Sequence, residues 1–337
     1  MEEKVVSVRE LTEQCVKHLM KAGMPDEDAR IATDVMIHAN LRGVDSHGVA
    51  RMEYYDAIFA HGDINFHPQI KIKQTGMVTA TVDGDDGLGL VVSYSAAKKA
   101  IEMAKDKGVG MVGVFNSSHC GAQSYYLKMA AEEKLISIAM SNAGSAVIPF
   151  GGKQPFFGTN PVAFGFPARR HPPILLDMAT SVVAGGKIVH DYLHRGKSIP
   201  IGWAVDEEGN DVTDPKLAKW LLHFAGPKGF GLAMVADIFS GMLSGGAFGP
   251  HLIVNEKQTL GQFLCFIDPA YFSDRDEFLD KIDQMIDEIH AIPPATGFDR
   301  VMVPGEPEQL REVHHSQYGI SLPMNIYEMF FESQTTK

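Results

Sequence analysis

The stretch GLGLVVSYSAAKKAIEMAKDKGVGMVGVFN, residues 87–116, places a glycine-rich turn, a helix and a strand in succession. Residues 91–108 are predicted to form the helix, and GMVGVFN (110–116) has the composition of a buried strand. A dinucleotide fold of the ordinary kind would show G-x-G-x-x-G directly after a strand. The nearest approach is GLGLVV (87–92), whose sixth position is Val92 and which lacks an acidic residue at the right distance. The sequence therefore predicts a turn before a helix and excludes an ordinary Rossmann domain.

Further strands are predicted on both sides of this stretch. The segments QIKIKQ (69–74) and MVTATVD (77–83) alternate apolar and polar residues around Thr75-Gly76, which is a hairpin signal. A helix over about 122–134 and three apolar strand candidates follow, LISIAMSN, PVAFGFP and PILLDMA. We expect residues 67–292 to form a mixed α/β domain.

Helices are predicted at both ends of the chain. Ser7 with Glu10 is a capping-box pattern, Pro25 opens a second helix to about Arg42, and a third is expected from about Ser46 to His61. The tail from about residue 306 is expected to be helical and to return to them. Residues 1–66 with about 293–337 would then make a helical domain.

Two more helices are expected in the last third. Residues 228–243, KGFGLAMVADIFSGML, are apolar nearly all round and predict a buried helix. Residues 273–292 are amphipathic, and one face is expected to carry Phe278, Ile282, Met285, Ile286 and Ile289.

Composition excludes several classes of protein. The 337 residues carry a formal charge of −12, which argues against nucleic-acid binding. No apolar run reaches membrane-spanning length, and MEEKVVSVRE does not resemble a signal peptide. The three cysteines, Cys15, Cys120 and Cys265, do not form a disulfide framework, so a cytoplasmic location is expected.

The segment LRGVDSHGVARMEYY (41–55) concentrates reactive side chains. On a helix from about Ser46, His47, Arg51 and Tyr55 fall at positions i, i+4 and i+8 and form one stripe. An imidazole, a guanidinium and a phenol on one stripe are unusual for a core face. The competing interpretation is a solvated face with an amphipathic Tyr.

A second concentration follows strand 110–116. His119 lies in the predicted strand-to-helix turn, where ligand-facing groups emerge in α/β domains; a helix-capping or buried histidine is the alternative. The neighbouring Cys120 suggests a nucleophile pair, but adjacent side chains rarely face each other, which disfavours a hydrolase. His190 and His194 have metal-ligand spacing without a third ligand, so a solvated helix face is favoured there.

The segment GPKGFG (226–231) is a glycine-rich turn that leads into a helix and carries Lys228. Helix N-termini attract anions, and the lysine adds a positive charge. The alternative is a plain turn with a surface lysine.

Several segments together resemble the malate/L-lactate dehydrogenase family of the non-Rossmann type, over nearly the whole chain. They are RGVDSHGVARMEYY (42–55), SSHCGAQSYY (117–126), PFGGKQPFFGTNPVAFGFP (149–167), LLDMATS (175–181), KSIPIGWAVDEEGN (197–210) and GPKGFG (226–231). The resemblance implies a helical domain from both chain ends and an α/β domain that binds NAD or NADP in its own way. It also implies a homodimer or a larger homo-oligomer.

The resemblance assigns roles to residues. It implies that His119 takes the substrate proton and His47 orients the substrate oxygen, although relatives differ in which of the two is the base. Ser46, Arg51 and Tyr55 are expected to face the substrate. Cofactor contacts are implied for Asp177, Met178, Ala179, Lys228, Gly305, Glu306 and Pro307, and no metal is expected.

Within the family, GPKGFG and PPATGFDRVMVPGEPE are most similar to ureidoglycolate dehydrogenases. The expected reaction is NAD-dependent oxidation of (S)-ureidoglycolate to oxalurate, with an inflection in the pH profile near the ordinary histidine pKa of about 6.5. Cys120 and Ala143-Gly144-Ser145 depart from that enzyme's pattern. Malate, lactate, sulfolactate or a diketo sugar acid are the alternative substrates, NADP is the alternative cofactor, and a nucleotide-binding regulator is the non-enzymatic alternative.

Overall fold

The computed structural model describes residues 3–188, 192, 196–254 and 257–332. Its N-terminal part contains strand β1 (Glu3–Val6) and helices α1 (Val8–Lys21), α2 (Asp26–Leu41) and α3 (Met52–His61). The predicted cap at α1 is confirmed, because Ser7 Oγ accepts from the Glu10 backbone N–H at 3.2 Å. Helix α2 begins directly after Pro25, as predicted.

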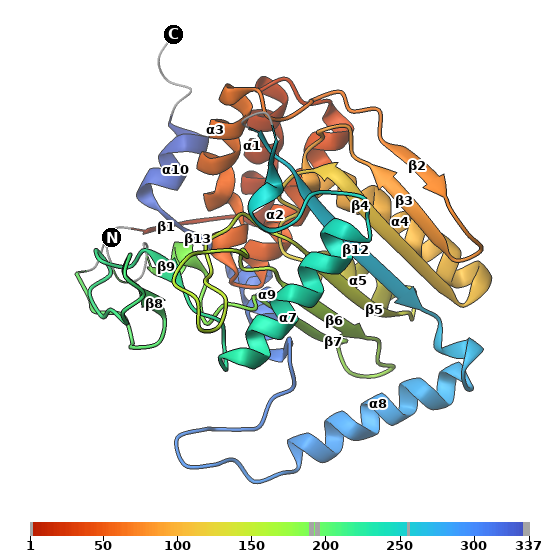
Figure 1. Ribbon diagram of the computed structural model, residues 1–337. Helices are drawn as coiled ribbons and strands as arrows, with labels where there is room; N and C mark the ends of the chain where they lie inside the picture. The colour runs from red at the N-terminus through yellow and green to blue at the C-terminus, as the bar shows by residue number, and fades with distance from the viewer. Residues whose placement is uncertain (1–2, 189–191, 193–195, 255–256, 333–337) are drawn as a thin grey trace.

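The C-terminal segment returns to these helices, as expected (Figure 1). It contains α9 (Glu306–Tyr318), β13 (Ile320–Pro323) and α10 (Met324–Phe331). Strand β1 pairs antiparallel with β13, so Val6 lies opposite Ile320. Leu11 and Leu19 of α1, Ile320 and Phe330 belong to one buried apolar cluster. Both chain ends therefore complete the same core.

A seven-stranded mixed sheet forms the centre of the protein, in the order β2-β3-β4-β12-β5-β6-β7. Only β3 and β4 run parallel, whereas an ordinary dinucleotide-binding sheet is mostly parallel. The α/β class and the exclusion of a Rossmann domain are thus confirmed. The strand bounds are β2 Lys71–Gln74, β3 Thr79–Asp83, β4 Val109–Ser117, β5 Ile136–Ser141, β6 Val162–Phe166, β7 Ile174–Met178 and β12 Leu260–Ile267.

Helices cover both faces of this sheet. Helices α4 (Gly89–Lys107) and α5 (Ser124–Glu132) pack on the face that carries Leu264 and Phe266 of β12. Helix α7 (Pro227–Asp237) and the π-helical turn η4 (Ile238–Met242) pack on the face that carries Phe263 and Cys265. Helix α8 (Arg275–His290) lies at the opposite end of the molecule from α1, α2 and α3 (Figure 1).

Short elements complete the chain. They are α6 Gly185–Lys187, the strand pairs β8 Ala204–Val205 with β9 Trp220–Leu221 and β10 Ile253–Val254 with β11 Lys257–Gln258, and the 3-10 turns η1 Asp45–His47, η2 Val49–Arg51, η5 Gly249–Leu252 and η6 Pro269–Tyr271. No described helix is long and apolar enough to cross a bilayer.

The prediction that residues 228–243 form a buried helix is wrong about burial. Five of its large apolar side chains are exposed, namely Met234, Val235, Ile238, Met242 and Leu243. Small residues such as Ala233, Ala236 and Ser240 face the sheet instead. The physical reason is a close approach, because a Cβ at Gly261 of β12 would lie 1.9 Å from the Ser240 carbonyl oxygen. A larger side chain could not fit at this point of closest approach, although Phe239 packs against Phe263 beside it.

The amphipathic face predicted for residues 273–292 is correct in part. Ile286 is buried and Ile282 and Ile289 pack against the same cluster, but Met285 is exposed. Asp283 takes a buried place on this face, where its carboxylate accepts the Arg170 and His171 backbone N–H groups. A buried carboxylate is tolerated there because it is hydrogen-bonded.

Candidate active site

The turn that carries His47 and Arg51 is not one continuous helix, and the predicted helix start near Ser46 is wrong. Two 3-10 turns, η1 and η2, precede α3. The helical geometry is interrupted between them at Gly48, whose backbone is extended, with φ −86° and ψ −155°. The regular i, i+4 relation between His47 and Arg51 is therefore lost.

Asn40 at the end of α2 causes this break. Its Oδ1 accepts the Val49 backbone N–H at 2.8 Å, and its Nδ2 donates to Asp45 Oδ1 at 2.8 Å. A Cβ at Gly48 would lie 2.3 Å from Asn40 Oδ1, so only glycine fits beside the amide. The Asn40 side chain thus fixes the shape of the turn.

The turn still brings the predicted side chains to His119. The His47 and His119 rings lie 5.4 Å apart between centroids, and the Tyr55 hydroxyl lies 2.9 Å from His119 Nδ1. Ser46 Oγ lies 3.0 Å from His47 Nδ1. The 45–55 segment and the loop after β4 therefore form one polar cluster.

His119 lies between β4 and α5, in the strand-to-helix turn that the sequence predicted. The start of α4 supports this turn, because the Gly89 N–H donates to Ser118 Oγ at 2.8 Å. The Gly121 N–H donates to His119 Nδ1 at 3.3 Å, on the same nitrogen that Tyr55 contacts. Within the described chain Nε2 makes no hydrogen bond, so it is the nitrogen available to a ligand.

Burial and neighbouring cations keep both histidines neutral. Burial lowers the pKa of His119 well below its usual value, and His47 and Arg51 lower it further. Burial also lowers the pKa of His47 to about 4, with Arg51 adding to the effect. Burial raises the pKa of Tyr55, which stays a neutral phenol. A neutral imidazole can accept a proton, whereas this tyrosine cannot act as the base.

Arg51 is a cation without an acidic partner among the residues that the structure describes. Its guanidinium lies 4.2 Å from the centroid of the Tyr54 ring, and its Nε is buried without a hydrogen bond. It forms no ion pair with any carboxylate of the described residues. A half-buried guanidinium with an unused donor matches the planar fork of a carboxylate ligand.

Two of the predicted cofactor segments meet at the edge of the sheet. Strand β7 ends with Asp177 and Met178, and the Leu175 N–H donates to the Pro304 carbonyl oxygen at 3.2 Å. Arg42 of α2, itself buried, donates to the Gly305 carbonyl oxygen at 3.1 Å and pairs with Glu312 at 2.9 Å. Arg42 thus holds the 305–307 turn against β7.

The acidic side chains of these segments are already hydrogen-bonded within the protein. Asp177 Oδ2 accepts the Ser124 backbone N–H at 2.8 Å. Glu306 Oε2 lies 2.9 Å from His290 Nε2 and accepts the Val303 N–H at 3.1 Å. Both carboxylates therefore shape the local backbone.

Lys228 lies in the first turn of α7, after Gly226, whose φ is +57°. Its side chain is exposed and makes no ion pair within the described residues. The residues just before α7 contact the 177–179 segment, because the Phe224 N–H donates to the carbonyl oxygen of Thr180, the residue after Ala179. The predicted helix N-terminus with a free lysine is thus present beside residues 177–179.

The structure argues against a catalytic role for Cys120. Cys120 is buried, and burial raises the pKa of its thiol to about 12, so a thiolate nucleophile is disfavoured. No three metal-ligating side chains come together in the described parts of the chain. His190 and His194 lie outside the described residues.

Two residues of this cluster were missed by sequence reasoning. Asn40 is buried and shapes the turn, and Tyr54 supports the Arg51 guanidinium. Tyr54 follows Arg51 by three residues, the spacing of helical neighbours, which was an available signal. Nothing local indicated the role of Asn40.

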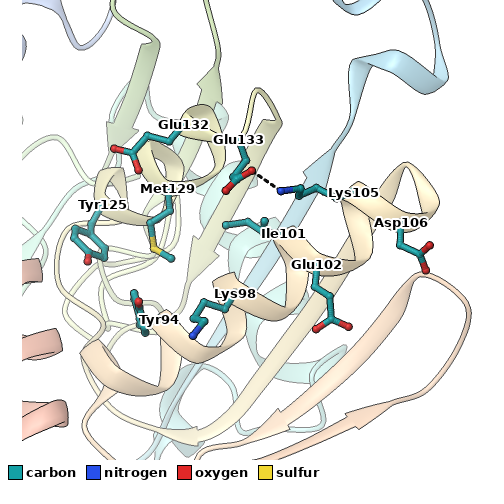
Figure 2. Close-up of a pocket in the computed structure, with 10 residues that line it drawn as sticks. All are labelled: Tyr94, Lys98, Ile101, Glu102, Lys105, Asp106, Tyr125, Met129, Glu132 and Glu133. Atoms are coloured by element: carbon teal, nitrogen blue, oxygen red, sulfur yellow. Dashed lines mark hydrogen bonds and ion pairs between the residues drawn. The ribbon is translucent and has the colours of Figure 1, made fainter.

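An open groove of about 750 Å³ lies elsewhere, between α4 and α5 (Figure 2). Tyr94 and Lys98 line it from α4, and Tyr125 and Met129 line it from α5. None of the residues predicted for the site lines this groove. The candidate site is therefore the cluster around His119.

Comparisons with known proteins show what the chain is similar to. Residues 6–330 match the family model described as malate/L-lactate dehydrogenase. The chain is 41% identical over 325 residues to a malate dehydrogenase of Pyrococcus horikoshii, covering 93% of this chain and 90% of the relative. It is 36% identical over 326 residues to a ureidoglycolate dehydrogenase (NAD(+)) of Escherichia coli O157:H7, covering 95% and 93%. The solved sulfolactate dehydrogenase of Methanocaldococcus jannaschii superposes with a TM-score of 0.90 at 36% identity, covering 98% and 96%.

Proposed function

Because the chain belongs to the malate/L-lactate dehydrogenase family, an oxidoreductase family that acts on CH–OH groups, we propose that it oxidises a 2-hydroxy acid with NAD. The favoured substrate is (S)-ureidoglycolate, which becomes oxalurate. The observation that carries the proposal is the unpaired Arg51 guanidinium in the same cluster as the neutral His119. A carboxylate and a hydroxyl on adjacent carbons need this combination of a cation and a base.

Proton transfer is assigned to His119 Nε2. Oxidation of a secondary alcohol releases one hydride and one proton, and bound NAD supplies the hydride acceptor. Nε2 carries the lone pair that accepts the hydroxyl proton in the tautomer with its proton on Nδ1. In that tautomer Nδ1 donates to the Tyr55 oxygen and the contact from the Gly121 N–H is given up. His47 orients the substrate oxygen, and Ser46 orients His47 through Nδ1.

The residues proposed for the cofactor fit it to different degrees. Lys228 makes no ion pair with the described residues and lies at a helix N-terminus, so it suits a phosphate group. Asp177 and Glu306 use their carboxylates internally, so their segments would contact the cofactor through backbone groups of residues 177–179 and 305–307.

Lys228→Ala is expected to raise the KM for the dinucleotide by about 10- to 150-fold, because a charge-assisted hydrogen bond is lost. The KM for the hydroxy acid should change little. Lys216→Ala, which removes another exposed lysine, is the control. An unchanged dinucleotide KM would mean that Lys228 is only a surface residue of a turn.

The pH profile should differ from the one that an ordinary histidine predicts. A base must be unprotonated, so the rate falls as the pH drops through its pKa, and the pKa of His119 is lowered. We therefore expect kcat/KM, which reports the free enzyme, to show no inflection between about pH 5.5 and 7.5. The inflection near 6.5 expected from the sequence is corrected accordingly. Initial rates would be measured with circular dichroism as a control for folding, and a clear inflection near 6.5 would contradict this reading.

Malate is the second candidate substrate, favoured by the 41% identity to a malate dehydrogenase. A panel of 2-hydroxy acids, crossed with NAD and NADP and ranked by kcat/KM, tests the proposal. If kcat/KM is highest with ureidoglycolate, the proposal is supported. If it is higher with malate, lactate or sulfolactate, that acid is the substrate instead. No reduction of either dinucleotide with any acid would favour a nucleotide-binding regulator.

A homodimer or larger homo-oligomer is also proposed. The exposed apolar residues of α7 and η4 support self-association, because contiguous exposed apolar surface is typical of interfaces. Sedimentation velocity tests this, and a monomer at all concentrations would refute it.

A further inference from the structure

Gln123, the residue before α5, has a buried side-chain amide that makes no hydrogen bond within the described part of the chain. It is 3% exposed, and neither its side-chain nitrogen nor its side-chain oxygen has a partner among the described residues. Buried polar groups are nearly always paired, and one left unpaired is costly. Both ends of this amide therefore lack the partner that a buried polar group needs, and a ligand bound beside it could supply one.

Gln123 lies between two segments of the proposed site. Two residues before it, the Gly121 N–H donates to His119 Nδ1. One residue after it, the Ser124 N–H donates to Asp177, and the backbone N–H of Gln123 supports the same carboxylate. The side chain thus starts between the proton-transfer histidine and the strand end assigned to the cofactor.

The chemistry of the amide selects its ligand. A glutamine side chain offers one acceptor oxygen and an NH₂ donor. A carboxylate only accepts, so it would leave the glutamine oxygen unpaired. Another primary amide or a ureido group offers a donor and an acceptor side by side and can pair with both.

We propose that Gln123 recognises an amide group, either the carboxamide of the nicotinamide ring or the ureido group of the substrate. This rests on the proposed function, because that function supplies both groups. In the first case Gln123 is a positioning residue for the ring that takes the hydride. In the second case Gln123 makes the site select ureidoglycolate over malate.

Gln123→Met tests the proposal, since methionine has a similar length and no amide. The first arm compares binding of NADH with its 3-acetylpyridine analogue, in which the carboxamide NH₂ is replaced by CH₃, by fluorescence titration. The wild-type protein should bind NADH about 3- to 10-fold more tightly, the range of one neutral hydrogen bond. In the variant this preference should disappear if the nicotinamide is the source.

The second arm compares kcat/KM for ureidoglycolate with that for malate. If the ureido group is the source, the variant should lose about 10-fold in this ratio while malate oxidation is retained. Ser137→Ala is the matched control, because it removes another buried polar group without a partner in the described chain, the Ser137 hydroxyl in β5, and should change neither ratio.

Unchanged ratios in both arms would overturn the proposal. Thermal melting checks the fold, and if Gln123→Met does not fold, Gln123→Asn, which withdraws the amide by one methylene, is measured in the same way. The dinucleotide arm needs no turnover, so it still reports on Gln123 if no 2-hydroxy acid is oxidised. Failure of the proposed function and failure of this inference are thereby distinguishable.

Discussion

His119→Asn is expected to lower kcat for alcohol oxidation by about 10²- to 10⁴-fold, the usual contribution of a general base. An asparagine amide can hydrogen-bond but cannot accept a proton at neutral pH. Dinucleotide binding, measured by quenching of protein fluorescence, should stay nearly unchanged, because the residue is assigned to the substrate proton. Stopped-flow absorbance of the reduced nicotinamide would measure the loss directly.

His47 is the rival base, since its ring lies 5.4 Å from that of His119 and its pKa is also lowered. The matched variant His47→Asn should mainly raise the substrate KM. If His47→Asn instead loses kcat while His119→Asn only weakens substrate binding, the two roles are reversed.

Arg51→Met is expected to lower kcat/KM by about 30- to 5,000-fold, because removing one partner of a buried charge pair costs about 2–5 kcal/mol. Arg51→Lys should recover only part of this loss, since an ammonium cannot reproduce the planar fork. The effect should be specific to the acid, so the variants would be assayed with a 2-hydroxy acid and with its uncharged amide.

Arg30→Met is the control for Arg51, because Arg30 is an exposed arginine of α2 that pairs with Asp26. It should leave kcat/KM unchanged. Full activity of Arg51→Lys and Arg51→Met would mean that the segment is only a solvated face.

Elements with a clear local pattern could be predicted from the sequence. The hairpin β2–β3 alternates apolar and polar residues, and α1 carries its own cap. The loop of His119 was found because it separates a strand from a helix. Strand β12 was not predicted, although it is the middle strand of the sheet. Seven of its eight residues are buried, so it lacks the alternation of apolar and polar residues that marks a strand with one solvent-exposed face.

The remaining errors arise from contacts between distant or tightly packed segments. The turn around Gly48 depends on the Asn40 side chain, which no local pattern couples to it. The exposure of Met234 and Ile238 follows from how closely α7 approaches Gly261. His47, Arg51, Tyr55 and His119 could be selected from the sequence by the chemistry of their side chains. That the 45–55 segment and the loop after β4 lie side by side could be seen only in the folded structure.

The pairing of β1 with β13 has a consequence for how the protein is made. Val6 can pair with Ile320 only after nearly the whole chain has been synthesised. At about 5–20 residues per second, a ribosome needs roughly 15–60 s to synthesise the chain between them. Until then Leu322 and Phe330 cannot pack against Leu11 and Leu19, so the apolar face of the nascent helix α1 stays exposed. Translation speed and chaperone supply are therefore expected to affect the yield of active protein.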